Sequence, residues 1–210
     1  MYKDGFGNIP NKDKVRNMLD EAFKIGPGDW IIHSHIIGKT SEKIAKEIGL
    51  DPEIAYAAGA LHDLGKGHGF KDLAHMMEGY RILRFESYFH PARIALGHGF
   101  VTVDFNSYHG DKNISHRDEE FLRAYLKKRE IDPYEKLIIL LDNLIKDKYL
   151  GLDERENLRN IPKTKERVKR LKILNTWQEE LESKLQNPIK DYLPRPRYYK
   201  FPYKLMRNVK

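Results

Sequence analysis

The strongest constraint on the fold is the spacing of apolar residues, which recur every three or four positions along most of the 210-residue chain. This spacing is the period of an amphipathic α-helix, whereas a half-buried strand would alternate apolar and polar residues. The sequence shows no clear series of alternating segments. We therefore predict an all-α protein, a helical bundle whose core is formed by the apolar faces of its helices.

Capping residues and breaks at glycine or proline divide the chain into the expected helices. Asp29 is expected to cap one helix, and Asp51-Pro52-Glu53 begins the next with proline at the first helical position. The loop expected at residues 100–115 is rich in Gly, Asn, Asp, Tyr and His, as lids and binding loops often are. The expected helices cover residues 11–25, 29–48, 54–65, 72–83, part of 87–99, 116–129, 133–147 and 164–186.

The composition indicates a soluble protein of the cytoplasm. Hydrophobic residues make up 40% and charged residues 33%, as in an ordinary globular domain. The longest aliphatic run, Leu137 to Leu141, is far shorter than the roughly 20 apolar residues of a membrane span. The first residues lack the apolar core of a secretion signal. The chain has no cysteine, which excludes disulfides and thiolate metal sites.

The net charge of +7 is concentrated after residue 160, and positive charge attracts anionic substrates or nucleic acids. We interpret KTKERVKRLK as a solvated helix face and the proline-containing end as an extended arm. This gives a domain at 1–188 and a basic aromatic tail at 189–210. The tail could fold over its own domain or a neighbouring subunit. Alternatively, it could bind nucleic acid by stacking bases on Tyr192, Tyr198, Tyr199, Phe201 and Tyr203.

Two polar side chains occupy positions that the helical period predicts to be buried. His33 falls on one stripe with Ile37 and Ile44, and Asp142 interrupts the apolar helix LIILLDNLI. A buried carboxylate is costly unless it is paired with a cation or bound to a metal. Taken alone, Asp142 is better explained by a salt bridge to a buried arginine or lysine, or by a hydrogen bond between helices.

The pair His62-Asp63 ends the small-residue helix AGALHD. Neighbouring helical residues point about 100° apart, so the two can bind one ion only where the helix end faces a cavity. Gly65 and Gly67 allow the backbone to turn close to a bound group. Together with the two buried polar residues, the pair indicates a metal site. Imidazole and carboxylate ligands suit iron or manganese, with zinc, cobalt or magnesium as alternatives.

The segment HSHIIGKTSEKIAKEIGLDPEIAYAAGALHDLGK resembles the HD-domain metal-dependent phosphohydrolase superfamily. That family has a histidine opening a helix, a later His-Asp pair, and a distal aspartate in a hydrophobic helix. The resemblance covers residues 30–145 and implies an HD-domain helical bundle. It implies that His33, rather than the neighbouring His35, is a ligand. The full set of ligands implied by these motifs is His33, His62, Asp63 and Asp142.

Two more segments resemble family regions that convert a one-metal site into a two-metal site. In LAHMMEGYRIL, His75 would be a ligand and Gly79 would permit close helix packing; in IALGHG, His98 would be a ligand. The resemblance then implies two divalent ions per chain that share Asp63. Some members carry a His-His pair where this chain has His98-Gly99, which argues against a third ion.

The resemblance implies an enzyme that cleaves a phosphate ester or anhydride in a phosphorylated small molecule, and a nucleotide is the favoured substrate. We hypothesise that a metal-activated hydroxide attacks phosphorus, with Asp63 holding the ion nearest to that water. Lys66 would bind a substrate phosphate, although it could instead be a surface lysine at a helix end. His109, in the long loop, is a candidate for contact with substrate.

Three alternatives stay open at this point. A mononuclear nucleotidase would bind one ion with His33, His62, Asp63 and Asp142 alone. An HD protein associated with RNA or other nucleic acid would use the basic tail. A degenerate member would only sense nucleotides, although the intact ligand set argues against it. The sequence also leaves open a homo-oligomer.

Overall fold

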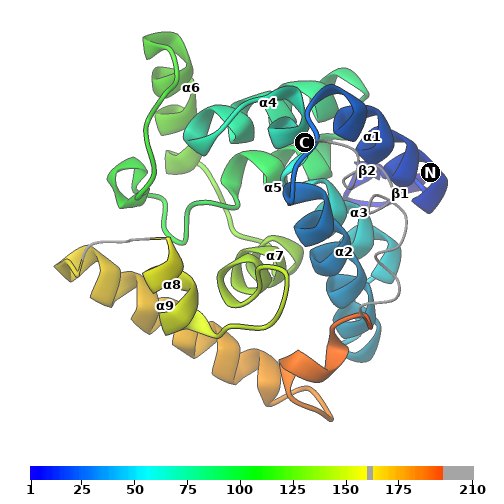
Figure 1. Ribbon diagram of the computed structural model, residues 1–210, viewed down its shortest axis with the longest axis vertical. Coiled ribbons are helices and arrows are strands. Elements are labelled where there is room, and N and C mark those ends of the chain that lie inside the picture. The colour runs from blue at the N-terminus through cyan, green and yellow to red at the C-terminus, as the bar shows by residue number, and fades with distance from the viewer. Residues whose placement is uncertain (160–162, 196–210) are drawn as a thin grey trace.

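The computed structural model describes residues 1–159 and 163–195, and the structural statements below refer to these. The prediction of an all-α fold is confirmed (Figure 1). A small hairpin of β1 (Tyr2–Lys3) and β2 (Gly7–Asn8) precedes the helices. The helices are α1 (Lys12–Ile25), α2 (Trp30–Glu47), α3 (Pro52–Leu61), α4 (Asp72–Phe85), α5 (Phe89–Gly97), α6 (His116–Lys127), α7 (Pro133–Leu144), α8 (Leu152–Leu158) and α9 (Lys165–Glu182).

Side-chain caps fix where several helices begin. The Asp51 carboxylate accepts from the backbone N–H of Glu53 at 2.8 Å at the start of α3, and the Asp132 carboxylate accepts from Glu135 at 2.9 Å at the start of α7. The expected cap at Asp29 is wrong, because its side chain makes no capping hydrogen bond. Asp29 already has a helical backbone, with φ −67° and ψ −14°. Its carbonyl oxygen accepts from the backbone N–H groups of Ile32 and His33, so the helical hydrogen bonds of α2 begin at this residue.

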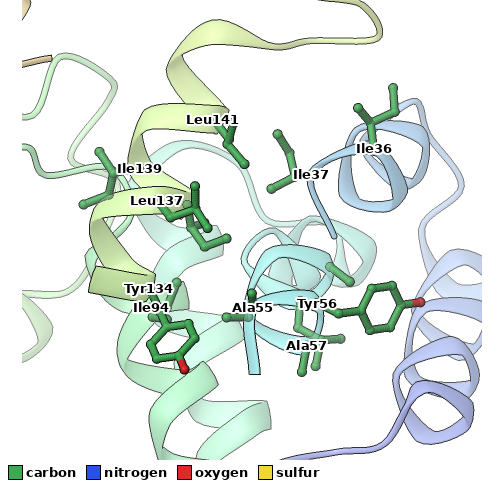
Figure 2. Packing of buried hydrophobic residues seen from close by; sticks show 14 of the residues in the cluster. Ile36, Ile37, Ala55, Tyr56, Ala57, Ile94, Tyr134, Leu137, Ile139 and Leu141 are labelled. Carbon is green, nitrogen blue, oxygen red and sulfur yellow. The ribbon is translucent and has the colours of Figure 1, made fainter. Parts of the chain in front are cut away.

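The main core lies where α2, α3, α5 and α7 meet. In Figure 1, α7 is seen along its axis, with α2 and α3 on one side and α8 and α9 on the other. Figure 2 shows side chains from these helices filling the space between them. Gly38 brings α2 close to α3, because a methyl group there would lie 2.8 Å from the Cβ of Ala60. The residues of α7 from Leu137 to Leu144 are all buried, so this helix crosses the interior.

The segment 100–115 is irregular, as predicted, but it is anchored. Phe100 and Phe105 are buried with their ring centroids 6.2 Å apart. The short 3-10 helix η2 (Phe105–Ser107) lies in this segment. The two rings join a second apolar cluster with α4, α5 and α6 that contains Leu73, Met76, Met77, Leu96, Leu122 and Leu126. This anchoring holds the following residues of the loop close to α4.

The charged region after Leu150 differs from the prediction. Helix α8 was not expected, since its seven residues LDERENL carry four charges and no apolar stripe. The interpretation of KTKERVKRLK as a solvated face is wrong for Arg167 and Arg170, which are buried. Both pair with the buried carboxylate of Glu156 at 2.7 Å, and this contact turns one side of α9 toward α8.

The expected extended arm is also wrong for its first residues. Ile189 and Tyr192 are buried in the 3-10 helix η3 (Ile189–Tyr192), which packs on α2. The Tyr192 hydroxyl donates to Glu47 at 2.7 Å, and because the ring itself is buried it is not available for stacking on bases. The other tail aromatics, Tyr198, Tyr199, Phe201 and Tyr203, lie outside the described residues. In the described part of the chain, no helix has both the length and the apolar character needed to cross a membrane.

Candidate metal centre

The pair His62-Asp63 lies where the backbone changes from α3 to the 3-10 helix η1 (Leu64–His68). The α-helix ends at Leu61, earlier than the predicted residue 65. Both side chains are fully buried, and the His62 Nε2 atom lies 3.5 Å from the Asp63 Oδ2 atom. The change of helix type therefore lets two adjacent residues face the same interior point.

Each carboxylate oxygen of Asp63 faces its own pair of histidines. Oδ2 lies 4.0 Å from His33 Nε2 on α2 and 3.5 Å from His62 Nε2. Oδ1 lies 3.0 Å from His75 Nε2 on α4 and 3.5 Å from His98 Nε2 at the end of α5. In each group of two histidines and Asp63, the ligand atoms lie within 4.8 Å of one another, a spacing that could hold a metal ion. Asp63 thus belongs to two adjacent ligand groups.

Asp142, on α7, extends the first group. Its Oδ1 atom lies 3.0 Å from His33 Nε2, and its Oδ2 atom accepts from Arg159 Nη2 at 2.7 Å. Both sequence interpretations of this residue therefore have a geometric basis, the metal ligand and the salt bridge. Burial alone would raise the pKa of Asp142, but the charge of Arg159 and the contact with His33 hold this pKa well below its usual value.

Backbone carbonyls orient three of the four histidines. The Nδ1 atoms of His33, His62 and His98 lie 2.9, 2.7 and 2.9 Å from the carbonyl oxygens of Lys146, Gly59 and Ala95, respectively. A carbonyl only accepts, so we assign a proton to each of these Nδ1 atoms, which leaves Nε2 as the atom that faces the carboxylates of the cluster. Burial lowers the pKa of His62 to about 3, which keeps this ring neutral at physiological pH.

The buried polar atoms of this cluster are placed so that they could bind a cation. His62 Nε2 has no hydrogen-bond partner among the described residues, although burial makes an unpaired polar atom costly. His33 Nε2 also lies 3.0 Å from the Asp142 Oδ1 atom, so a nitrogen and a carboxylate oxygen of the first group meet at one point. Imidazole nitrogens and carboxylate oxygens are ligands for divalent metals. The side chains present therefore fit a metal centre.

Lys66 lies at the edge of the cluster. Its Nζ atom is 2.6 Å from Asp63 Oδ2, and the lysine side chain is half-buried. Burial alone would raise the pKa of Asp63, but Lys66 and His62 hold this pKa well below its usual value. Asp63 is therefore ionised at neutral pH, as a metal ligand must be.

A cavity of about 260 Å³ opens beside the cluster. His109 lies on its wall, half-buried, and its Nε2 atom has no hydrogen-bond partner within the described residues. A side chain at Gly99 would lie 2.9 Å from Met76 Sδ and 3.1 Å from the Tyr108 ring, so these two groups fill the space beside His98. The wall comprises Lys66, Asp72, His75, Met76, His98, Gly99, Tyr108, His109, Gly110, Asp142, Arg159 and Arg170.

The sequence interpretation missed the arginines of this wall. Arg159 follows α8, and Arg170 lies on α9. A buried Asp142 signalled the need for a cation, but nothing in the sequence indicated which arginine would supply it. His35 is not in either ligand group; it is half-buried, and burial, assisted by Lys39, lowers its pKa.

Comparison with known proteins gives one match. The sequence model of a family described as HD domain matches residues 30–147, a range that contains all six candidate ligands. No curated protein and no solved structure matches the chain.

Proposed function

Since the chain belongs to the HD domain family, we propose that it is a metal-dependent phosphohydrolase with two divalent ions in its active site. His33, His62, Asp63 and Asp142 would hold one ion, and Asp63, His75 and His98 would hold the other. One observation carries this proposal: the two oxygens of the buried Asp63 face separate histidine pairs. A carboxylate in this position is suited to bridge two ions.

The reaction proposed is hydrolysis of a phosphate ester or anhydride. Divalent ions, when bound, lower the pKa of water and neutralise charge on a phosphoryl group. Lys66 lies on the cavity wall next to Asp63, where its ammonium would bind and orient a substrate phosphate. Tyr108 presents a ring at the same wall, which supports a planar substituent such as a nucleobase, and hence a nucleotide substrate. Iron or manganese is the proposed metal.

The direct test replaces the proposed bridging ligand. The full-length chain and its Asp63→Asn variant would be loaded separately with Mn, Fe, Co, Zn and Mg and assayed against a panel of phosphorylated metabolites. Asp118→Asn is the matched control, because Asp118 is a surface residue of α6 paired with Arg81. We expect D63N to lose bound metal and at least about 100-fold in activity, and D118N to keep both. Retention of metal and activity in D63N would reject the proposal.

Metal content separates the two-ion site from the mononuclear alternative. The proposal predicts two ions per chain, and only one after His98→Gln, because His98 contacts Asp63 from the second group. A mononuclear nucleotidase would bind a single ion in the parent chain and would keep it after the same substitution.

A further inference from the structure

Two arginines stand side by side on the cavity wall. Arg159 Nη1 donates to Asn143 Oδ1 at 2.8 Å, and Arg170 Nη2 donates to the same oxygen. A neutral amide thus holds together two like charges that repel each other. Burial, followed by the charge of Arg159, lowers the pKa of Arg170 to about 10, so Arg170 still carries its proton at neutral pH. Such a pair is favourable where a bound anion compensates the repulsion.

Arg170 is held in place before any ligand arrives. Its Nη1 atom donates to Glu156 Oε1 at 2.7 Å, and Glu156 is fully buried. The same carboxylate also pairs with Arg167 Nε at 2.7 Å, so its charge is shared between two arginines. A guanidinium held by a shared carboxylate has a fixed orientation, and it is therefore preorganised to bind an anion.

Arg159 connects this pair to the candidate metal centre. Its Nη2 atom donates to Asp142 Oδ2 at 2.7 Å, and Asp142 is one of the proposed ligands. Arg159 therefore lies beside the place where the phosphoryl group under attack would bind. Arg170 lies next to Arg159 on the same wall of the cavity. The cationic side chains of the wall are Lys66, Arg159 and Arg170, and its carboxylates are Asp72 and Asp142. A metal ion on Asp142 would offset one of these two negative charges.

We infer that Arg159 and Arg170 form a second phosphate site, and that the substrate carries two adjacent phosphoryl groups. The reaction would then cleave a phosphoanhydride, such as that of a nucleoside diphosphate or triphosphate, and not the monoester of a neutral alcohol. This inference rests on the proposed function, which places the phosphoryl group under attack at the metal centre. Guanidinium forks match the oxygens of phosphate groups and bind them through paired hydrogen bonds.

The test measures binding of a non-hydrolysable probe. Methylenediphosphonate, which has two adjacent phosphoryl groups, and orthophosphate would be titrated calorimetrically into the full-length, metal-loaded chain. The variants are Arg170→Gln and Arg167→Gln. Both remove one partner of Glu156 and share that structural effect, but only Arg170 lines the cavity. The metal content of each sample would be measured in parallel.

We expect the parent chain to bind the diphosphonate at least about tenfold more tightly than orthophosphate. R170Q should lose about 10- to 100-fold in affinity for the diphosphonate, the effect of a charge-assisted hydrogen bond, while R167Q changes it less than about threefold. Equal affinities for the two probes, or equal losses in the two variants, would overturn the inference. If the inference is overturned but metal content and orthophosphate binding are normal, the proposed function still stands. If the chain binds no metal, the proposed function itself is rejected.

Discussion

Replacing Gly65 by alanine would place a methyl group 2.1 Å from the carbonyl oxygen of His75 and 2.8 Å from the amide nitrogen of Gly79. Both obstacles are backbone atoms, so no side chain can rotate to make room. The 3-10 helix η1 and helix α4 would have to separate by about 1.3 Å to reach ordinary van der Waals contact. Overpacking of this kind costs about 1–3 kcal/mol of folding free energy.

The same movement would disrupt the second ligand group. Asp63 immediately precedes η1, and His75 lies on α4, so the separation would pull these two ligands apart. Metal–ligand distances tolerate only about 0.2 Å of change, and a movement several times larger should prevent binding there. We expect G65A to lose about one of two ions, while the group of His33 and His62 is less affected.

Gly79→Ala is the matched control, because Gly79 lies on the other side of the same contact. A methyl group there would have its nearest neighbours at 3.4 and 3.5 Å, which is ordinary contact. The sequence predicts that Gly79 permits close helix packing, but the close approach of η1 to α4 depends on Gly65. G79A should keep both ions and its stability, or gain up to about 1 kcal/mol from helix propensity. Urea unfolding with chelator, together with metal analysis, gives both readouts. A stable two-ion G65A, or a G79A as impaired as G65A, would refute this reasoning.

Two further predictions concern buried charge. Burial lowers the pKa of His62 to about 3, so in chelator the unfolded chain takes up a proton below about pH 6.5 that the folded chain does not. Stability must therefore fall with acidification, by about 2 kcal/mol from His62 between pH 7 and 5, and His62→Gln should remove that part of the loss in urea titrations at the two pH values. Arg129→Met would leave Glu135 buried and unpaired, since Arg129 Nη2 lies 2.9 Å from its carboxylate; the expected loss is about 3–5 kcal/mol. Burial raises the pKa of Glu135, so this loss should shrink toward pH 5 as the carboxyl group is protonated, and a deficit that stays constant with pH would argue against an unpaired charge.

The sequence could predict the parts of the site that depend on one helix at a time. Helical periodicity placed His33 and Asp142 on buried faces, and both are buried. The His-Asp pair could bind jointly only if a helix end faced a cavity, and α3 ends immediately before it. These predictions hold because the direction of a side chain on a helix follows from its position in the period.

What could not be predicted depends on packing between distant segments. Arg170 is buried because Glu156, fourteen residues earlier on a short and highly charged helix, meets it with a carboxylate. From composition alone, the side chains of this region are predicted to be exposed to solvent. Likewise, proline-rich and basic composition suggested an extended arm, whereas Tyr192 is bound by Glu47, 145 residues earlier. A charged or aromatic residue near the end of a chain does not reveal its partner.

The central claim is that Asp63 would contribute to the binding of two divalent ions, and an anomalous difference map from crystals soaked in manganese tests it most directly. Two peaks are predicted on opposite sides of the Asp63 carboxylate. One should lie among His33, His62 and Asp142, and the other between His75 and His98. A map with no peak at Asp63, or with one peak that only His33, His62 and Asp142 surround, would contradict the account.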